Sequence, residues 1–261
     1  MTVSYRTAIT IVQFIFFVPS AVYAIWLCFH HGLKAAGTWR FIATLSLLRV
    51  AGSISYFVSL SNPGLHVMMS VVVCELSGLA PLMLVCVALV GRVNKTANVF
   101  PEKAAICISL LSLVGLILGI VGTDRALHKA ATTDDIHLNS LIRAALALFL
   151  AGFTLMLVGY FALVQDVLRH PAKRAILGSE VRILAIVGLA APFVFVRLLY
   201  SALGDLTGAE LWSSINGNNT VYLVMDVLME IIAITIMYTT VRFAPLPNDP
   251  SAERIADAEG G

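Results

Sequence analysis

Long runs of apolar residues, separated by short polar stretches, dominate the pattern of this 261-residue chain. A helix needs about twenty mostly apolar residues to cross a bilayer, and seven segments meet that length. These segments cover residues 8–30, 41–60, 66–90, 104–121, 138–164, 183–203 and 220–241. The stretches between them are rich in Gly, Pro, Asn and charge, as is typical of connections. The pattern predicts an all-α, polytopic membrane bundle of seven transmembrane helices over residues 1–241, followed by a disordered tail over residues 242–261.

The Lys and Arg residues between the predicted helices are unevenly distributed, and this predicts the orientation. Eleven lie in the first, third and fifth connections and the tail, whereas three lie in the N-terminal segment and the remaining connections. In multi-pass proteins the excess of positive charge lies in the short cytosolic connections. We therefore expect a lumenal or extracellular N-terminus and a cytosolic C-terminus, in the endoplasmic reticulum or the plasma membrane.

Composition agrees with a membrane protein and excludes several other classes. The chain is 59% hydrophobic and 12% charged, whereas a soluble domain has about 25% charged residues. A net charge of +2 gives no reason to expect a nucleic-acid partner. The four cysteines lie inside apolar segments and the six histidines do not cluster, so we expect no metal site and no cofactor. The predicted helices contain no lysine, which excludes a retinal Schiff base.

Five charged residues lie deep inside the predicted helices. They are Arg49, Arg197, Glu75, Asp226 and Glu230. At about 1.5 Å per residue they lie roughly 10–18 Å from the outer ends of their helices, between the outer quarter and the midplane of a core about 30 Å thick. A single charge at mid-bilayer costs roughly 2.5–3.5 kcal/mol. We therefore expect the five to face the interior of the bundle and to neutralise one another.

Hydroxyl groups accompany these charges on the same helix faces, at spacings of three or four residues. The residues expected to line a polar pocket with them are Tyr200, Tyr222, Ser53 and Ser201. Three acids against two arginines leave one carboxylate without a partner, and protonating one acid is the least costly remedy in a dry pocket. A neutral carboxylic acid there is a proton donor. The alternative is an ion-pair network that only fixes helix packing.

A weak internal repeat relates the first three helices to the last three, around a connecting fourth. The segments "LLRVAGS" and "FVRLLYS" align Arg49 with Arg197, and Glu75 then corresponds to Asp226. The pattern favours a 3+1+3 pseudo-repeat with a cavity between its halves. Prolines at positions 19, 81 and 192 fall within predicted helices, and we expect "GLAP" in the third and "LAAP" in the sixth to bend them near the charges.

Three stretches resemble fungal seven-helix proteins of the RTA-like, lipid-translocating-exporter group. They are "CELSGLAPLMLVCVALVGR", "FVRLLYSALG" and "VYLVMDVLMEII". In that group "LAP" followed by "GR", an arginine in the sixth helix and "Y…D" in the last recur in this order. The resemblance implies a lipid or small-molecule translocator, although the group has an acid in the second helix where this chain has Arg49. A second likeness, of architecture alone, is to the small membrane-bound terpene cyclases of fungi, whose essential acids lie in an early and the last helix, as Glu75 and Asp226 do.

Two functions follow from the buried charges, and both involve an apolar lipid-, terpenoid- or polyketide-like ligand in contact with membrane lipids. We favour acid–base cyclisation or isomerisation in secondary metabolism, because the surplus acid suits proton donation. Asp226 or Glu230 would donate the proton, a second carboxylate such as Glu75 would accept one, and Tyr222 or Tyr200 would assist. The alternative is an RTA-like translocator or exporter that uses the same charges as a headgroup site. A receptor is a weaker third option because the cytosolic connections are short.

Overall fold

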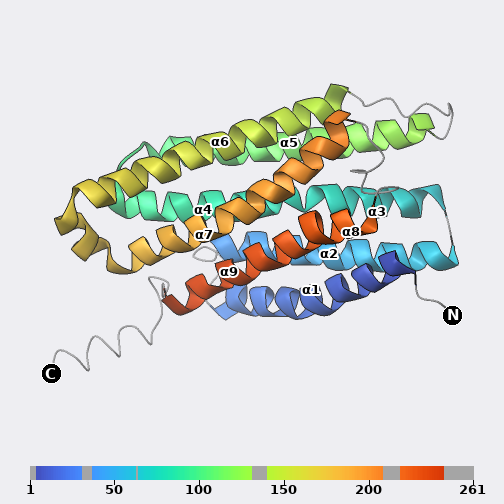
Figure 1. Cartoon of the computed structure of the whole chain (residues 1–261), viewed down its shortest axis with the longest axis horizontal. Coiled ribbons are helices and arrows are strands. Elements are labelled where there is room, and N and C mark those ends of the chain that lie inside the picture. The colour runs from blue at the N-terminus through green and yellow to red at the C-terminus, as the bar shows by residue number, and fades with distance from the viewer. Residues whose placement is uncertain (1–3, 31–36, 63, 131–139, 208–217, 244–261) are drawn as a thin grey trace.

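Seven long helical spans run back and forth through one bundle (Figure 1). The computed structural model describes residues 4–30, 37–62, 64–130, 140–207 and 218–243. Its elements are α1 (Tyr5–His30), α2 (Gly37–Ser61), α3 (Leu65–Ser77), α4 (Leu79–Ala97), α5 (Glu102–Ala130), α6 (Ser140–Arg169), α7 (Pro171–Thr207), α8 (Asn219–Tyr222), η2 (Leu223–Leu228) and α9 (Met229–Phe243). No strand occurs in these ranges, so the all-α prediction is confirmed.

Each predicted span corresponds to a helical segment that is long and apolar enough to cross a membrane. The third span is formed by α3 and α4 together, and the seventh by α8, η2 and α9. Large apolar side chains lie on the outer surface, with Phe29, Val158 and Leu168 each more than 60% exposed. Exposed apolar surface of this kind needs lipid rather than water around it. The chain is an integral, multi-pass membrane protein.

Several helices extend further than the apolar pattern predicted. Helix α4 continues to Ala97 instead of residue 90, and α5 continues to Ala130 instead of residue 121. Only His170 separates α6 from α7, where a longer connection was expected. Hydropathy detects the part of a helix that crosses hydrocarbon, whereas the backbone hydrogen bonds continue into the polar layer. The predicted tail begins at residue 242; α9 includes residues 242 and 243, and the rest of the tail lies outside the described residues.

Helix α4 is the centre of the bundle. Every residue from Leu79 to Val87 is buried, and α4 packs against α2, α5, α6 and α7. Near "GLAP", where a bend was expected, α3 ends at Ser77 and α4 begins after Gly78, although the Gly78 backbone keeps helical angles, with φ of −62° and ψ of −26°. Pro81 lies in the first turn of α4, where the backbone N–H that proline lacks would have no helical partner. Helix α7 runs unbroken through Pro192 but is interrupted at Gly178, whose φ of 16° and ψ of −84° are not helical.

A tight connection between α4 and α5 is fixed by one side chain. The amide of Asn94 donates to the Phe100 carbonyl at 2.7 Å and accepts from the backbone N–H groups of Val99 and Phe100 at 3.1 and 3.0 Å. Asn98 ends α4 in the left-handed conformation, with φ of 53°. Side-chain bonds of this kind satisfy the terminal backbone groups of a helix.

The contact between α5 and α6 depends on glycines spaced three or four residues apart. A Cβ atom on Gly115 would lie 3.3 Å from the Ala145 carbonyl oxygen, and one on Gly119 would lie 3.8 Å from the Ala145 Cβ. A Cβ atom on Gly122 would lie 2.8 Å from Ile142. The pattern GxxxG brings membrane helices close together because no side chain separates the backbones. This signal is present in the sequence, and it escaped the charge-based reasoning.

Candidate functional site

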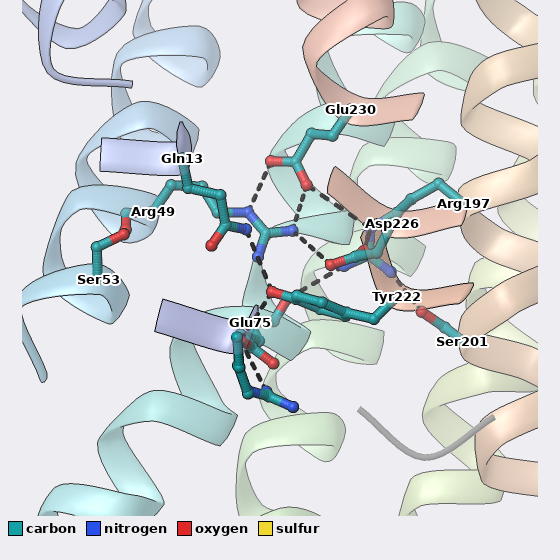
Figure 2. A network of polar contacts seen from close by, with 10 residues as sticks. Gln13, Arg49, Ser53, Glu75, Arg197, Ser201, Tyr222, Asp226 and Glu230 are labelled. Atoms are coloured by element: carbon teal, nitrogen blue, oxygen red, sulfur yellow. Dashed lines mark hydrogen bonds and ion pairs between the residues drawn. The ribbon is translucent and has the colours of Figure 1, made fainter. Parts of the chain in front are cut away.

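The buried charges predicted from the sequence lie together near the middle of the bundle, joined by hydrogen bonds and ion pairs (Figure 2). A sixth residue, Arg6 of α1, joins them through an ion pair. We call this set the charge cluster: Arg6, Arg49, Arg197, Glu75, Asp226 and Glu230. Its members come from α1, α2, α3, α7, η2 and α9, so the cluster connects the beginning of the chain to its last span.

Arg49 and Glu230 form the innermost pair. The Arg49 Nε donates to one carboxylate oxygen of Glu230 at 2.8 Å, and Nη2 donates to the other. Nη2 also lies 3.6 Å from the Asp226 carboxylate. The side chains of Arg49 and Glu230 are 3% and 1% exposed. This two-pronged pairing suits the planar guanidinium group and is the strong form of an Arg–carboxylate contact.

Arg197 is bound from three directions. Its Nε is ion-paired with Asp226, and lies 3.6 Å from Glu230. Its Nη1 donates to the Ser201 hydroxyl at 2.7 Å, and its Nη2 donates to the backbone carbonyl of Glu75 at 3.2 Å. Arg197 therefore holds α7 to both α3 and η2, and an arginine at this depth requires such partners.

Glu75 belongs to a separate, outer part of the charge cluster. Its carboxylate accepts a hydrogen bond from the Tyr222 hydroxyl at 2.8 Å and lies 3.4 Å from Nη2 of Arg6. The Gln13 amide donates to the same tyrosine hydroxyl at 3.2 Å. Arg6 also lies over the Tyr222 ring, 5.0 Å from its centre. The side chains of Arg6 and Glu75 are 16% and 15% exposed, so this part of the cluster is less deeply buried than the inner pair.

Arg6 corrects the charge count that the sequence predicted. The expected surplus acid was based on two arginines, with Arg6 assigned to the external N-terminal segment. Helix α1 begins at Tyr5, and the long Arg6 side chain reaches back into the bundle to pair with Glu75. Three arginines then face three carboxylates, and the formal charge of the cluster is zero. The prediction of one carboxylate without a partner is wrong.

A turn of π-helix carries Asp226. The sequence predicted a regular helix here, in which Tyr222, Asp226 and Glu230 share one face. Over eight residues an α-helix turns about 80° beyond two full turns, which would move Glu230 away from Tyr222. The wider turns of η2 reduce this drift, so that all three side chains point toward the cluster (Figure 2). Single π turns within α-helices are frequent at functional sites.

Two glycines give the charge cluster its space. A Cβ atom on Gly78 would lie 3.2–3.3 Å from three guanidinium atoms of Arg49. A Cβ atom on Gly52 would lie 3.1 Å from the Cβ of Cys74 on α3. The break between α3 and α4 thus coincides with the point where Arg49 crosses the helix. The sequence reasoning connected this break with Pro81 and missed the role of Gly78.

The remaining predicted pocket residues lie beside the charge contacts. The Ser53 hydroxyl donates to the Arg49 backbone carbonyl at 2.9 Å, within its own helix. Tyr200 is fully buried and packs with Tyr222 and Val227 in a small apolar cluster. The hydroxyl groups of Tyr222 and Ser201 make hydrogen bonds to side chains of the charge cluster, whereas that of Ser53 contacts the Arg49 backbone.

Two hollows lie on opposite sides of α3. The apolar pocket, between α3, α4, α5, α6 and α7, leaves about 40 Å³ of free space. Its lining is apolar except for the hydroxyl groups of Ser77, Thr123 and Ser201. The polar cleft, between α1, α2 and α3, leaves about 10 Å³ and borders both Arg49 and Glu75. No group of three or more His, Cys, Asp or Glu side chains suitable for a metal ion occurs among the described residues.

Comparison with known proteins assigns the chain to a family. The model of a domain of unknown function, DUF7702, matches residues 3–243. The chain belongs to the DUF7702 family. The match includes every helix and all six members of the charge cluster. No curated protein and no solved structure matches the chain.

The chemistry open to this DUF7702 member depends on the pairing of its charges. Every carboxylate of the charge cluster lies within 4 Å of an arginine, and a neighbouring positive charge favours the ionised form of an acid. The cluster offers a fixed, neutral array of donors and acceptors inside an apolar bundle. Such an array suits recognition of a polar group on a molecule that is otherwise soluble in lipid.

Proposed function

We propose that this protein binds and translocates an amphipathic lipid or apolar small molecule through the bundle. One contact carries the proposal. The Ser201 hydroxyl lines the apolar pocket and also accepts the hydrogen bond from Arg197. A ligand whose apolar part occupies the pocket would therefore have its polar group beside the charge cluster. Pockets of this composition, apolar with a few polar groups that orient the ligand, are typical of small-molecule sites.

The α5–α6 side of the pocket is the proposed entrance from the bilayer. Helix α5 is the least buried span, and Gly119 and Ala145 at its contact with α6 both line the pocket. The present free space of about 40 Å³ is too small for an acyl chain. The proposal therefore includes separation of α5 and α6 on binding. A contact made by small side chains can separate with little loss of buried apolar area.

Exchange of lipid between the two leaflets of a proteoliposome tests translocation. A membrane-impermeant reducing agent destroys the fluorescence of labelled lipid in the outer leaflet. Labelled lipid in the inner leaflet loses its fluorescence only after it crosses to the outer leaflet. We expect the protein to accelerate loss of the protected signal. Ala145→Phe, which fills the pocket, should slow it, whereas Ala151→Phe, at an exposed position of the same helix, should not. Equal rates with and without protein would refute translocation of that lipid.

Acid–base cyclisation or isomerisation remains the second candidate, and the Tyr222–Glu75 hydrogen bond favours it. Glu75 lies in the less buried part of the charge cluster, and its 2.8 Å contact with the Tyr222 hydroxyl is a route for a proton. Positioned acid–base groups of this type accelerate proton transfer. Incubation of protein-containing membranes with polyprenyl and polyketide substrates tests this function. An isomeric product that Glu75→Gln abolishes would support it, and the absence of product with lipid exchange intact would favour translocation.

A further inference from the structure

The guanidinium group of Arg49 has one side that the protein does not satisfy. Nε and Nη2 are directed at the carboxylates of Glu230 and Asp226. Nη1 is buried and has no hydrogen-bond partner. A buried donor without an acceptor is unfavourable, and in native proteins such a group usually marks a bound water or ligand. Arg49 borders the polar cleft, so an acceptor can reach it from there.

The polar cleft fits a single oxygen atom. Its free space of about 10 Å³ is roughly that of one water molecule. Besides Arg49 and Glu75, its lining includes the polar side chains of Thr10, Gln13 and Ser53. The hydroxyls of Ser53 and Thr10 donate to carbonyls of their own helices at 2.9 and 3.1 Å. Their oxygen atoms keep the capacity to accept a further hydrogen bond.

The charges around the polar cleft determine whether an anionic, cationic or uncharged group can bind there. The charge cluster is neutral when its three arginines and three carboxylates are ionised, so an added anion would be a buried charge without a counter-ion. Glu75 on the cleft wall would repel that anion, and Arg49 would repel a cation. An uncharged group that accepts from Arg49 and donates to a hydroxyl or carboxylate oxygen meets every requirement. A hydroxyl group does both, whereas a ketone or an ether only accepts.

Room for the rest of such a molecule lies outside the cleft, at the exposed surface of α2 and α3. A shallow groove there leaves about 230 Å³ and is lined by the apolar Ile54, Val58 and Val67 and by the polar Ser55, His66 and Ser70. Ile54 and Val58 are large apolar side chains on the outer surface, 49% and 45% exposed. An apolar molecule held in this groove would have lipid on its other side.

We propose that the polar cleft binds the hydroxyl group of an apolar alcohol, such as a long-chain alcohol or a sterol, through Nη1 of Arg49. A water molecule occupies the position when no alcohol is bound. This site lies on α1–α3 and does not share its lining residues with the apolar pocket, so it stands apart from the translocation proposal.

Thermal unfolding of the purified full chain in detergent, with four ten-carbon probes, tests the site. The probes are 1-decanol, decane, decanoate and decylammonium at equal concentration. A ligand that binds only the folded protein raises the Tm, and we expect 1-decanol to raise it most. No shift with 1-decanol would leave water as the occupant and would overturn the proposal. An equal or larger shift with decanoate or decylammonium would overturn the hydroxyl assignment.

Matched variants locate the effect. Ser53→Val removes an acceptor and fills the cleft, so it should weaken the apparent 1-decanol affinity at least about tenfold, as for loss of a hydrogen bond in a charged network. Ser109→Val is the control, because Ser109 also donates to its own helix at 2.9 Å but lies on α5. If Ser53→Val does not fold, Thr10→Val replaces it, with Thr154→Val as its control. Undiminished affinity in the cleft variants would overturn the site, and loss in Ala145→Phe alone would assign the alcohol to the apolar pocket.

Discussion

Replacement of Glu230 by glutamine is the sharpest test of how the bundle is held together. Glutamine keeps the shape of the side chain but removes the charge that Arg49 faces. Arg49 is 3% exposed and cannot turn toward water, so its guanidinium would keep only the Asp226 carboxylate at 3.6 Å. The variant loses two charge-assisted hydrogen bonds to an ionised partner, each worth about 1.5–3 kcal/mol. Because glutamine can still accept one weaker bond, we expect Glu230→Gln to lower the free energy of unfolding by about 3–5 kcal/mol.

The ion pair between Arg92 and Glu180 gives a reference against which the loss in Glu230→Gln can be compared. Arg92 and Glu180 join α4 to α7 at 3.3 Å, but their side chains are 24% and 14% exposed. Solvent screens a pair of this exposure, and such pairs contribute about 0–1 kcal/mol. Glu180→Gln should therefore change the stability by less than about 1 kcal/mol. The two substitutions are chemically identical, but the sites differ in burial, in hydrogen-bond geometry and in the second arginine, Arg197, that lies 3.6 Å from Glu230.

Reversible unfolding in mixed micelles, followed by circular dichroism as denaturing detergent is added, measures both variants. The double variant Arg49→Met with Glu230→Met adds a further check. Replacing both partners of a buried pair by apolar groups is often close to neutral, so we expect the double variant to recover at least half of the loss. If Glu230→Gln and Glu180→Gln have the same small effect, burial does not control the strength of the pair, and the reasoning is refuted.

Three further predictions concern close contacts with the backbone. Gly78→Ala places a Cβ against the buried guanidinium of Arg49 and should lower the free energy of unfolding by about 1–3 kcal/mol. Gly64→Ala is the control, because its added Cβ would lie 3.9 Å from its nearest neighbour, and its loss should be clearly smaller. Equal losses would contradict the steric argument. Asn94→Ala removes the three hydrogen bonds that hold the α4–α5 turn. It should lower the Tm and reduce the free energy of unfolding by about 1–3 kcal/mol. An unchanged Tm would show that water replaces these hydrogen bonds. Gly122→Leu should force α5 away from α6, because an added Cβ would already lie 2.8 Å from Ile142. A cysteine crosslink between the two helices should then form more slowly than in the parent, and an unchanged rate would contradict this.

The number of helical spans and the presence of a buried charge cluster were predictable because both follow from the cost of polar groups in hydrocarbon. Twenty apolar residues specify one crossing, and five charges at similar depth require one another. The same reasoning failed at Arg6, since it assigned each residue by its position along the chain. Arg6 is only the second residue of α1, yet its side chain is long enough to reach Glu75. One missed arginine changed the net charge of the cluster and with it the favoured chemistry.

Local geometry was less accessible from the sequence. The π turn at Asp226 has no composition of its own, because "LVMDVL" is apolar apart from the aspartate. Its position follows from contacts with Arg49 and Arg197, which are 177 and 29 residues away in the chain. Gly78 shows the opposite case. Its spacing before Pro81 marks the break between α3 and α4, but the neighbour that requires a glycine there is Arg49, on another helix.

The partners of Arg49 also bear on how the protein is made. Both of its carboxylate partners lie on the last span, which leaves the ribosome after the other six. Until residues 219–243 enter the membrane, the growing chain holds Arg49 and Arg197 in hydrocarbon without the counter-ions of η2 and α9, and the charges remain costly. The seventh span thus supplies the counter-ions that stabilise the two arginines of the earlier helices. A chain truncated before residue 219 would keep Arg49 and Arg197 in the membrane without the carboxylates of Asp226 and Glu230.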